Sequence, residues 1–427
     1  MYKKIIKTFS VYTITAIVSA GLSIFILPIL TKYLSPKDYG ITALFSTYVM
    51  IASPFMGFSS SGLFWIKFFK QEDKDKLNKY FSTYYWFVSF CAICLIFLLL
   101  IFSPIFKSYS FFNILFIALV PITSFFSVIG DETRNYFVNN KRPVTYFVYS
   151  ISVVLFELAL SYIFVVYVFR SWEGRILAWV TSLFIQFIFT TFLFAPQKKY
   201  LKFEIKIPYL KELIIFGYPL IFHQLGKFVI NQSDRLFITK MVSIDAAGIY
   251  SVGYQVGSML LLPIGAFVNF YAPFVYERLA NINEEKKIEI VRLSYYFVAI
   301  ILICFVGIIA ISPLFFKLLI DPKFNGGMQY VFWVALAYVF WGGYMLFATT
   351  IFFKQRTKIL GWLSVVNVLL NMTLNYFFIN KFGPVGAAYA TSVSFFVVLL
   401  ITAFFSNKFY PMPWLFFLKD RNVLSNQ

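Results

Sequence analysis

Twelve apolar runs follow one another along this 427-residue chain, with only short polar connectors between them. Each run has roughly 18–24 residues, the length that a helix needs to cross the hydrocarbon core of a bilayer. No connector is long enough to form a soluble domain. The sequence therefore predicts an all-α integral membrane protein with twelve transmembrane helices. The runs cover residues 8–30, 40–63, 80–102, 111–130, 144–168, 175–195, 213–237, 247–271, 293–311, 328–351, 360–379 and 384–406.

The basic residues fix the orientation of these spans. The chain carries 37 Lys and Arg against 18 Asp and Glu, a formal charge of +19. With the N-terminus in the cytoplasm, 26 basic residues fall in cytoplasmic segments, 9 fall outside, and Lys227 and Arg235 lie within a span. This asymmetry follows the positive-inside rule, and a shift of one helix would invert it. Both termini are therefore expected in the cytoplasm, and the basic excess needs no nucleic-acid partner. The outside residues are Lys32, Lys37, Lys107, Arg170, Arg175, Lys240, Lys317, Lys323 and Lys381.

An internal duplication divides the spans into two halves. LTKYLSPKDYGI at 30–41 matches ITKMVSIDAAGI at 238–249 with a constant offset of 208 residues. Each copy follows the first span of a six-span half, and an even number of spans makes both halves run in the same direction. Transporters with two such halves place the substrate path at their interface. We expect two parallel six-helix lobes around a central cleft. They comprise residues 1–195 and 213–406, joined by a cytoplasmic linker, 196–212, and followed by a cytoplasmic tail, 407–427.

The seventh span is unusually polar. At about 100° per residue, His223, Lys227, Asn231 and Asp234 fall within an arc of roughly 80°, and Arg235 adjoins it. Ionisable groups cost on the order of 2.5–3.5 kcal/mol each within a span, so such a stripe favours the wall of a water-filled cavity. The alternative is that Lys227 and Asp234 neutralise each other while Arg235 snorkels to the outer interface. His223, the single histidine, is expected to hydrogen-bond in the cavity wall and does not indicate a metal site.

Other polar residues within the spans each have two possible roles. Glu157 in the fifth span either binds a coupling cation or pairs with a base from another helix, and Asp234 is a second candidate for ion coupling. Asn367, Asn371 and Asn375 repeat every four residues, which favours interhelical hydrogen bonding over cavity lining. The sequence contains no phosphate-binding glycine loop and no catalytic motif. It therefore predicts a transporter that needs no cofactor, not an enzyme.

Four segments together resemble a known family. They are LPILTKYLSPKDYGITALF (27–45), WEGRILAWVTS (172–182), NQSDRLFITKMVSIDAAGIYSVGYQV (231–256) and FGPVGAAYATSVS (382–394). These stretches resemble the bacterial polysaccharide-unit (Wzx-type) flippases of the multidrug/oligosaccharidyl-lipid/polysaccharide exporter superfamily. The resemblance runs through the whole chain in order. It implies a multi-pass protein of the bacterial cytoplasmic (inner) membrane that acts in O-antigen or capsule biosynthesis.

The resemblance also implies a substrate and its partners. Such flippases move undecaprenyl-diphosphate-linked oligosaccharide from the cytoplasmic to the outer leaflet by alternating access, among membrane lipids and beside a polysaccharide polymerase and chain-length proteins. On this expectation Lys227 and Arg235 attract the diphosphate. Asn231, Asp234, His223 and Gln255 line the substrate path, and the aromatic residues Tyr254, Trp333, Tyr338 and Trp341 contact sugars.

Three alternatives to a flippase are weighed. A drug/cation antiporter of the same superfamily is expected to bind cations with carboxylates, but the spans hold only Glu157 and Asp234. An integral membrane polymerase or acyltransferase is expected to have a long outer loop, or an intramembrane histidine with a partner. A major-facilitator carrier is expected to have a Gly-Asp-Arg-rich motif between spans 2 and 3, where this chain has KFFKQEDKDKLNK.

The twelve-span topology predicts the side of each connector. Reporter fusions at Lys74, Lys202 and Glu284 are expected in the cytoplasm, and fusions at Lys37, Lys240 and Lys323 outside. Paired alkaline phosphatase and fluorescent-protein fusions measure this directly. One fusion on the wrong side would break the twelve-span arrangement.

Overall fold

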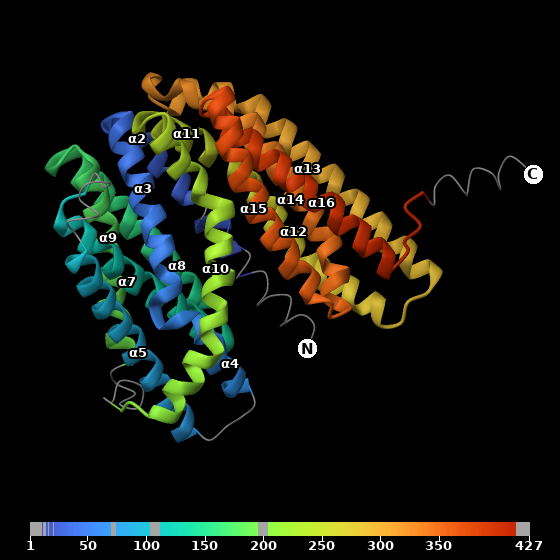
Figure 1. Cartoon of the computed structure of the whole chain (residues 1–427), viewed down its shortest axis with the longest axis horizontal. Coiled ribbons are helices and arrows are strands. Elements are labelled where there is room, and N and C mark those ends of the chain that lie inside the picture. The colour runs from blue at the N-terminus through green and yellow to red at the C-terminus, as the bar shows by residue number, and fades with distance from the viewer. Residues whose placement is uncertain are drawn as a thin grey trace, which may run out of the picture. The chain divides into compact units, whose positions relative to one another are not determined.

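Helices are the only regular secondary structure in the part of the chain that the structure describes. The computed structural model describes residues 11, 14–15, 17–19, 21–69, 74–102, 112–194 and 204–415 (Figure 1). Among these residues, ten helical segments are long and apolar enough to cross a membrane, and a shorter apolar helix covers Ile17–Tyr33. This confirms the all-α membrane class. The count of twelve spans and the position of the termini stay predictions.

The chain forms two compact units, which divide after Leu236. In the first unit α7 contacts most of the other helices, because α3, α5, α8 and α9 all pack against it. The elements of this unit are α2 (Ile26–Tyr33), α3 (Pro36–Ala52), the 3-10 segment η1 (Ser53–Ser59), α4 (Ser61–Phe69), α5 (Lys74–Ile101), α7 (Ile114–Asn139), α8 (Pro143–Ile163), the π-helical turn η2 (Phe164–Val168), α9 (Trp172–Phe194) and most of α10 (Ile207–Met241).

In the second unit α14 takes the central position. It packs most extensively on α16, and also contacts α11, α12 and α13, while α15 packs mainly on α16. The elements are α11 (Ile244–Gly257), η4 (Ser258–Leu260), α12 (Leu261–Ala280), α13 (Glu284–Leu319), η5 (Pro322–Gly327), α14 (Met328–Phe353), α15 (Thr357–Phe382) and α16 (Val385–Phe409).

The duplicated motif has the same local structure in both copies. Ser35 caps α3 by accepting a hydrogen bond from the N–H of Asp38, and Ser243 caps α11 by accepting one from Ala246. The helices that precede the two copies, α2 and α10, end 208 residues apart, and the helices that follow them, α3 and α11, begin 208 residues apart. This is the offset of the sequence match. A side-chain cap satisfies a backbone N–H at a helix start that has no partner within the helix. The superposition of the two six-helix halves stays a prediction.

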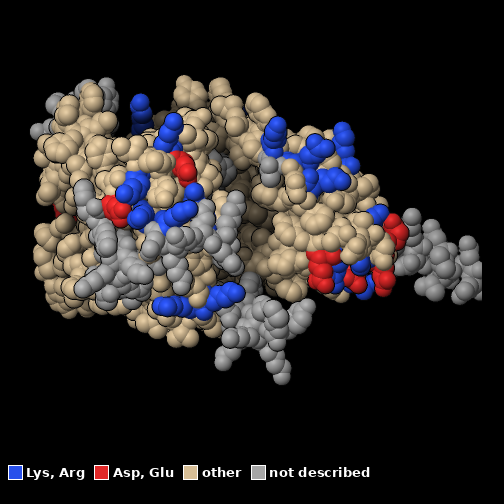
Figure 2. All heavy atoms as spheres, turned by 90° about the horizontal axis from the view of Figure 1, so that it is seen from below, with Lys and Arg blue, Asp and Glu red and all other residues tan. Residues whose placement is uncertain are grey.

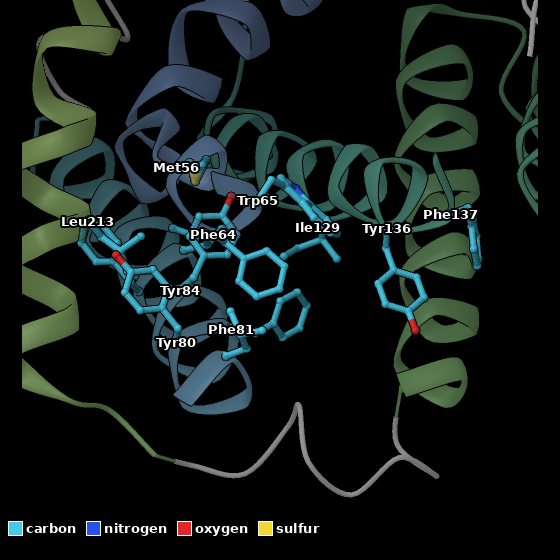
Figure 3. Packing of buried hydrophobic residues seen from close by; sticks show 14 of the residues in the cluster. Met56, Phe64, Trp65, Tyr80, Phe81, Tyr84, Ile129, Tyr136, Phe137 and Leu213 are labelled. Atoms are coloured by element: carbon cyan, nitrogen blue, oxygen red, sulfur yellow. The ribbon is translucent and has the colours of Figure 1, made fainter. Parts of the chain in front are cut away.

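The N-terminal part of α10 packs within the first unit. Glu212 forms an ion pair with Lys67 of α4 (Nζ to Oε2, 2.8 Å) and accepts a hydrogen bond from the hydroxyl of Tyr80. Leu213 is fully buried in an aromatic cluster that α4, α5 and α7 also build (Figure 3). The assignment of this helix to the second lobe of residues 213–406 therefore stays a prediction.

Basic side chains gather at one end of the first unit. Figure 2 looks onto the end at which α5 and α10 begin, and several groups of Lys and Arg side chains lie on that face of the first unit. The sequence assigns this end to the cytoplasm, where the positive-inside rule places such residues.

Two glycines allow close approach of helices, and their substitution tests the packing. A Cβ on Gly217 would overlap the carbonyl oxygen of Phe58, and one on Gly253 would overlap the carbonyl oxygen of Gly327. Gly217→Ala and Gly253→Ala are each expected to lower the free energy of unfolding by about 1–3 kcal/mol, since the backbone must shift. Gly265→Ala and Gly307→Ala, where no heavy atom lies within 4 Å of the new Cβ, are the matched controls.

In a helix, replacing glycine by alanine without a clash stabilises by roughly 0.5–1 kcal/mol. Thermal unfolding in detergent is therefore expected to separate the two pairs of variants in opposite directions. Equal effects at all four positions would contradict the packing described here.

Candidate functional site

The helix α10 carries the polar residues of the seventh predicted span. It is 35 residues long. The charged residues Lys211, Glu212, Lys227, Asp234 and Arg235 all lie on it. A helix of this kind needs protein or water on its polar side, since lipid cannot solvate charges.

Asp234 and Arg235 form a buried ion pair near the C-terminal end of α10. The guanidinium Nη1 of Arg235 lies 2.7 Å from Oδ1 of Asp234, and the two side chains are only 6% and 5% exposed. The backbone N–H of Arg235 donates to the same carboxylate oxygen. The alternative interpretation, in which Arg235 snorkels to the outer interface, is therefore wrong for this side chain. The neighbouring carboxylate compensates its charge inside the protein, so the side chain has no need to reach water.

Three of the predicted residues lie on α10 with side chains outside the described part. His223, Lys227 and Asn231 follow one another at intervals of four residues along a continuous helix, so their backbone positions share one side of it. Their roles in binding stay predictions. Gln224, in contrast, has a described side chain, and it reaches a cavity in the first unit.

That cavity has a volume of about 260 Å³ and lies next to the aromatic cluster of Figure 3. It is smaller than the roughly 300–1,000 Å³ of most drug-sized ligand sites. Its lining combines two carboxyl groups with several neutral oxygen-bearing side chains. The lining residues are Met50, Ser53, Pro54, Met56, Ser59, Ser61, Tyr84, Val128, Asp131, Glu132 and Gln224.

Glu157 pairs with a base from another helix, which was one of its two expected roles. Its Oε1 lies 2.6 Å from Nη2 of Arg175 in α9, and the same guanidinium donates to the hydroxyl of Ser161. Both charged side chains are about four-fifths buried. The sequence counted Arg175 as an outer-connector residue. It reaches back along α8 because an ion pair costs less than an isolated carboxylate in a span.

The residues expected to contact sugars differ in exposure. Gln255 of α11 is exposed. Tyr254 and Tyr338 are buried, and their hydroxyls hydrogen-bond to each other at 2.6 Å. These two tyrosines therefore act as packing between α11 and α14.

The asparagine ladder of α15 is likewise buried, and it bonds between helices as the sequence favoured. Asn375 donates to Asn371, which donates to Ser394 of α16. These bonds provide amide partners in the protein interior, where lipid offers none, although the Oδ1 atoms of Asn367 and Asn375 are buried without a hydrogen-bond partner.

Sequence analysis missed Glu132. The fourth run was placed at 111–130, and Glu132 was taken as part of the connector that follows it. In the structure α7 continues to Asn139. The signal was present, because Ile129, Thr133 and Tyr136 continue the helical spacing of buried positions and no breaking residue intervenes.

Comparison with known proteins identifies relatives across most of the chain. The sequence pattern of the family described as polysaccharide biosynthesis protein matches residues 29–329. An uncharacterized membrane protein of Haemophilus influenzae is 23% identical over 371 residues, which cover 86% of this chain and 88% of that protein.

The fold is also that of known transporters. The lipid II flippase MurJ, in an inward closed conformation, has a TM-score of 0.72 at 16% identity and covers 92% of this chain and 86% of its own. An inward-facing multidrug resistance MATE transporter of the MOP superfamily also has a TM-score of 0.72, at 12% identity, with 91% and 94% covered. Together with the apolar helices, the shared fold indicates a multi-pass membrane protein.

The Glu157–Arg175 pair generates a stability test. Arg175→Gln leaves a carboxylate without its counter-charge and is expected to lower the free energy of unfolding by about 3 kcal/mol, and Glu157→Gln acts similarly on the arginine. The double variant is expected to recover most of the loss, because neither charge remains. Lys287→Ala, which removes a pair whose Glu284 is 77% exposed, is the control and is expected to cost less than about 1 kcal/mol.

Thermal unfolding of the four variants measures the coupling between the two side chains. Additive losses in the double variant would mean that the two groups do not stabilise each other.

Proposed function

Because the chain belongs to the polysaccharide biosynthesis protein family, we propose that it flips undecaprenyl-diphosphate-linked oligosaccharide from the cytoplasmic to the outer leaflet. The observation that carries this proposal is the family match over residues 29–329. The fold likeness to a lipid II flippase, which also handles a lipid, adds support. The product is a surface polysaccharide, O-antigen or capsule.

The physical problem that such a protein solves is desolvation. A diphosphate and a chain of sugar hydroxyls cannot enter hydrocarbon, because each unpaired polar group costs kcal/mol there. The lipid tail, in contrast, stays in the bilayer throughout. The protein has only to replace water around the head group, which calls for a cationic, hydrogen-bonding path. In this proposal Lys227 and Arg235 of α10 supply the positive charge, and Asn231, His223, Asp234 and Gln255 supply hydrogen bonds.

The direction of transfer agrees with the membrane potential. With the cytoplasm negative, outward movement of each anionic charge is favoured by roughly 2.3 kcal/mol per 100 mV. The lipid-linked unit carries its negative charge on the diphosphate. The potential therefore favours export, and alternating access by two six-helix lobes provides the path.

A multidrug transporter is the second candidate, since the multidrug resistance MATE transporter shares this fold to the same TM-score as MurJ. The two functions differ in the charge of the substrate. A drug exporter raises resistance to cationic dyes when expressed, whereas a flippase leaves resistance unchanged. A polymerase or acyltransferase has no comparable support from the relatives.

Deletion of the gene tests the proposal directly. Undecaprenyl-diphosphate-linked oligosaccharide is expected to accumulate in the inner leaflet, and surface polysaccharide is expected to be lost. Mass spectrometry of extracted lipids identifies the accumulated unit. Normal surface polysaccharide in the deletion strain, with raised sensitivity to dyes, would favour the drug exporter.

Substitutions in α10 test the role of its cations. Lys227→Ala is expected to lower surface polysaccharide at least tenfold at unchanged protein levels in the membrane, because the diphosphate loses its counter-charge. Arg235→Ala is expected to lower surface polysaccharide as much and also to lower stability, because Asp234 is left buried without its partner. Lys227→Arg is expected to keep partial activity, since the charge survives with altered geometry. Lys240→Ala, an exposed lysine at the end of the same helix, is the matched control and is expected to keep full activity.

A double variant separates binding from scaffolding. If Arg235 serves only to neutralise Asp234, then removing both charges in Asp234→Asn/Arg235→Gln restores export, because no unpaired buried charge remains. We expect no recovery. Full recovery of surface polysaccharide would remove Arg235 from the substrate path.

A further inference from the structure

Glu132 is a membrane carboxylate whose described hydrogen-bond partners are all neutral. Its Oε2 accepts a hydrogen bond from the indole Nε1 of Trp65 at 3.1 Å, and its Oε1 accepts one from Asn135. The side chain of Ser61 lines the same cavity as Glu132. Within the described ranges no lysine or arginine nitrogen forms an ion pair with it, whereas Glu157 and Asp234 each have an arginine within 2.7 Å.

The space beside this carboxylate is suited to a small ligand. The cavity of about 260 Å³ has Glu132 in its wall, together with the oxygen-bearing side chains of Ser53, Ser59, Ser61 and Gln224. A site that is polar and roomy enough can hold water together with an ion. The volume fits such a group and is far too small for an oligosaccharide.

The backbone next to the cavity is irregular. Gly57, Phe58 and Ser59 in η1 all have positive φ, at 58°, 55° and 54°. Non-glycine residues in this region cost on the order of 1–3 kcal/mol each and persist where the surroundings impose them. Irregular backbone at membrane depth is tolerated where it lines a cavity. In transporters, unwound segments of this kind supply carbonyl oxygens to coupling cations.

We propose that the Glu132 cavity binds one small monovalent cation, either a proton or Na⁺, that compensates the charge of Glu132. The position suits exchange with the cytoplasm, because Glu132 lies two turns before the end of α7 that the predicted topology assigns to that side. Binding of the cation does not depend on the proposed function. Its coupling to flipping does rest on that function.

Several charged groups around α7 form ion pairs. Asp131, the second carboxylate that lines the cavity, pairs with Arg134 at 2.7 Å. The pairs of Lys67 with Glu212, and of Arg175 with Glu157, account for charges on α4, α10, α8 and α9. The charges of α3 and the described basic side chains of α5 lie in the first two turns of those helices. Titratable groups near the cavity without a charge partner are Tyr84 and Cys91 of α5 and Tyr149 of α8, and α10 also carries His223 and Lys227.

Trp65 makes the site measurable, because a cation on Glu132 changes the electric field at the indole that donates to it. Purified full-length protein in detergent is titrated with NaCl in a potassium buffer at pH 8, and separately from pH 8.5 to pH 5 without Na⁺. Tryptophan emission is the readout. The wild type is expected to show a saturable change, and Trp65→Phe is expected to lose it. His223→Asn, which removes the histidine that titrates in the same range, is expected to keep it.

Glu132→Gln is the decisive variant. It keeps the shape of the side chain and is expected to abolish the emission change or to shift its midpoint at least tenfold. Glu173→Gln, a carboxylate in the first turn of α9, is the matched control and keeps the wild-type response. A response to NaCl identifies Na⁺, and a response to pH alone identifies a proton. No response in the wild type, or an unchanged one in Glu132→Gln, overturns the proposal.

Folding and function are separated by two further measurements. Circular dichroism and thermal unfolding report whether Glu132→Gln is folded. If it is not, the comparison of wild type with Trp65→Phe still decides, because a response that survives the loss of Trp65 does not come from this site. Lys227→Ala is expected to lose export while keeping the emission change. A full emission response in a protein that flips no lipid-linked sugar would overturn the proposed function and leave the cation site standing.

Discussion

Hydrocarbon offers no hydrogen-bond partner, and this constraint accounts for how most of the charged and amide groups discussed above are paired. Backbone groups are satisfied within helices, and hydroxyl side chains bond back to carbonyls one turn earlier, as Thr133 does to Ile129. Charges follow the same rule on a larger scale. Glu157 and Asp234 each lie against an arginine, and the amides of α15 bond to one another and to α16. A membrane carboxylate without a charge partner, such as Glu132, therefore stands out, because Glu157 and Asp234 each have one.

The interruption at η1 is the clearest departure from regular helix in the first unit. Three consecutive residues with positive φ carry a local cost that a continuous helix avoids. The hydroxyl of Ser60 donates to the carbonyl of Gly57 and relieves part of that cost. The break also allows α10 to approach closely, since Gly217 lies against the carbonyl of Phe58. The irregular segment thus joins three features, namely the cavity, the aromatic cluster of Figure 3 and the N-terminal part of α10.

Periodicity and spacing in the sequence predicted the helices well, but they predicted the contacts between side chains less well. The all-α class followed from run lengths, and the equivalence of Ser35 and Ser243 followed from the duplicated motif, because a cap depends on local sequence alone. The partner of Asp234 did not follow. Side chains at adjacent positions point to different sides of a helix, so spacing does not predict this pair, yet the long side chain of Arg235 turns back to its neighbour. Glu132 was missed because hydropathy marks where a run stops being apolar, which is earlier than where the helix ends.

The proposed cation at Glu132 and the diphosphate of the proposed substrate carry opposite charges, so the membrane potential acts on them in opposite directions. The potential already favours outward movement of an anionic head group, by roughly 2.3 kcal/mol per charge per 100 mV, so a cation is not needed to supply that energy. A ligand shifts a conformational equilibrium only by its difference in affinity between the two states, and a tenfold difference corresponds to about 1.4 kcal/mol. The return of the empty transporter is the step that the potential opposes or leaves unaffected. A cation bound to Glu132 is therefore expected to act in that step. We therefore expect the cation to shift the conformational equilibrium of η1, where the helical backbone is already interrupted.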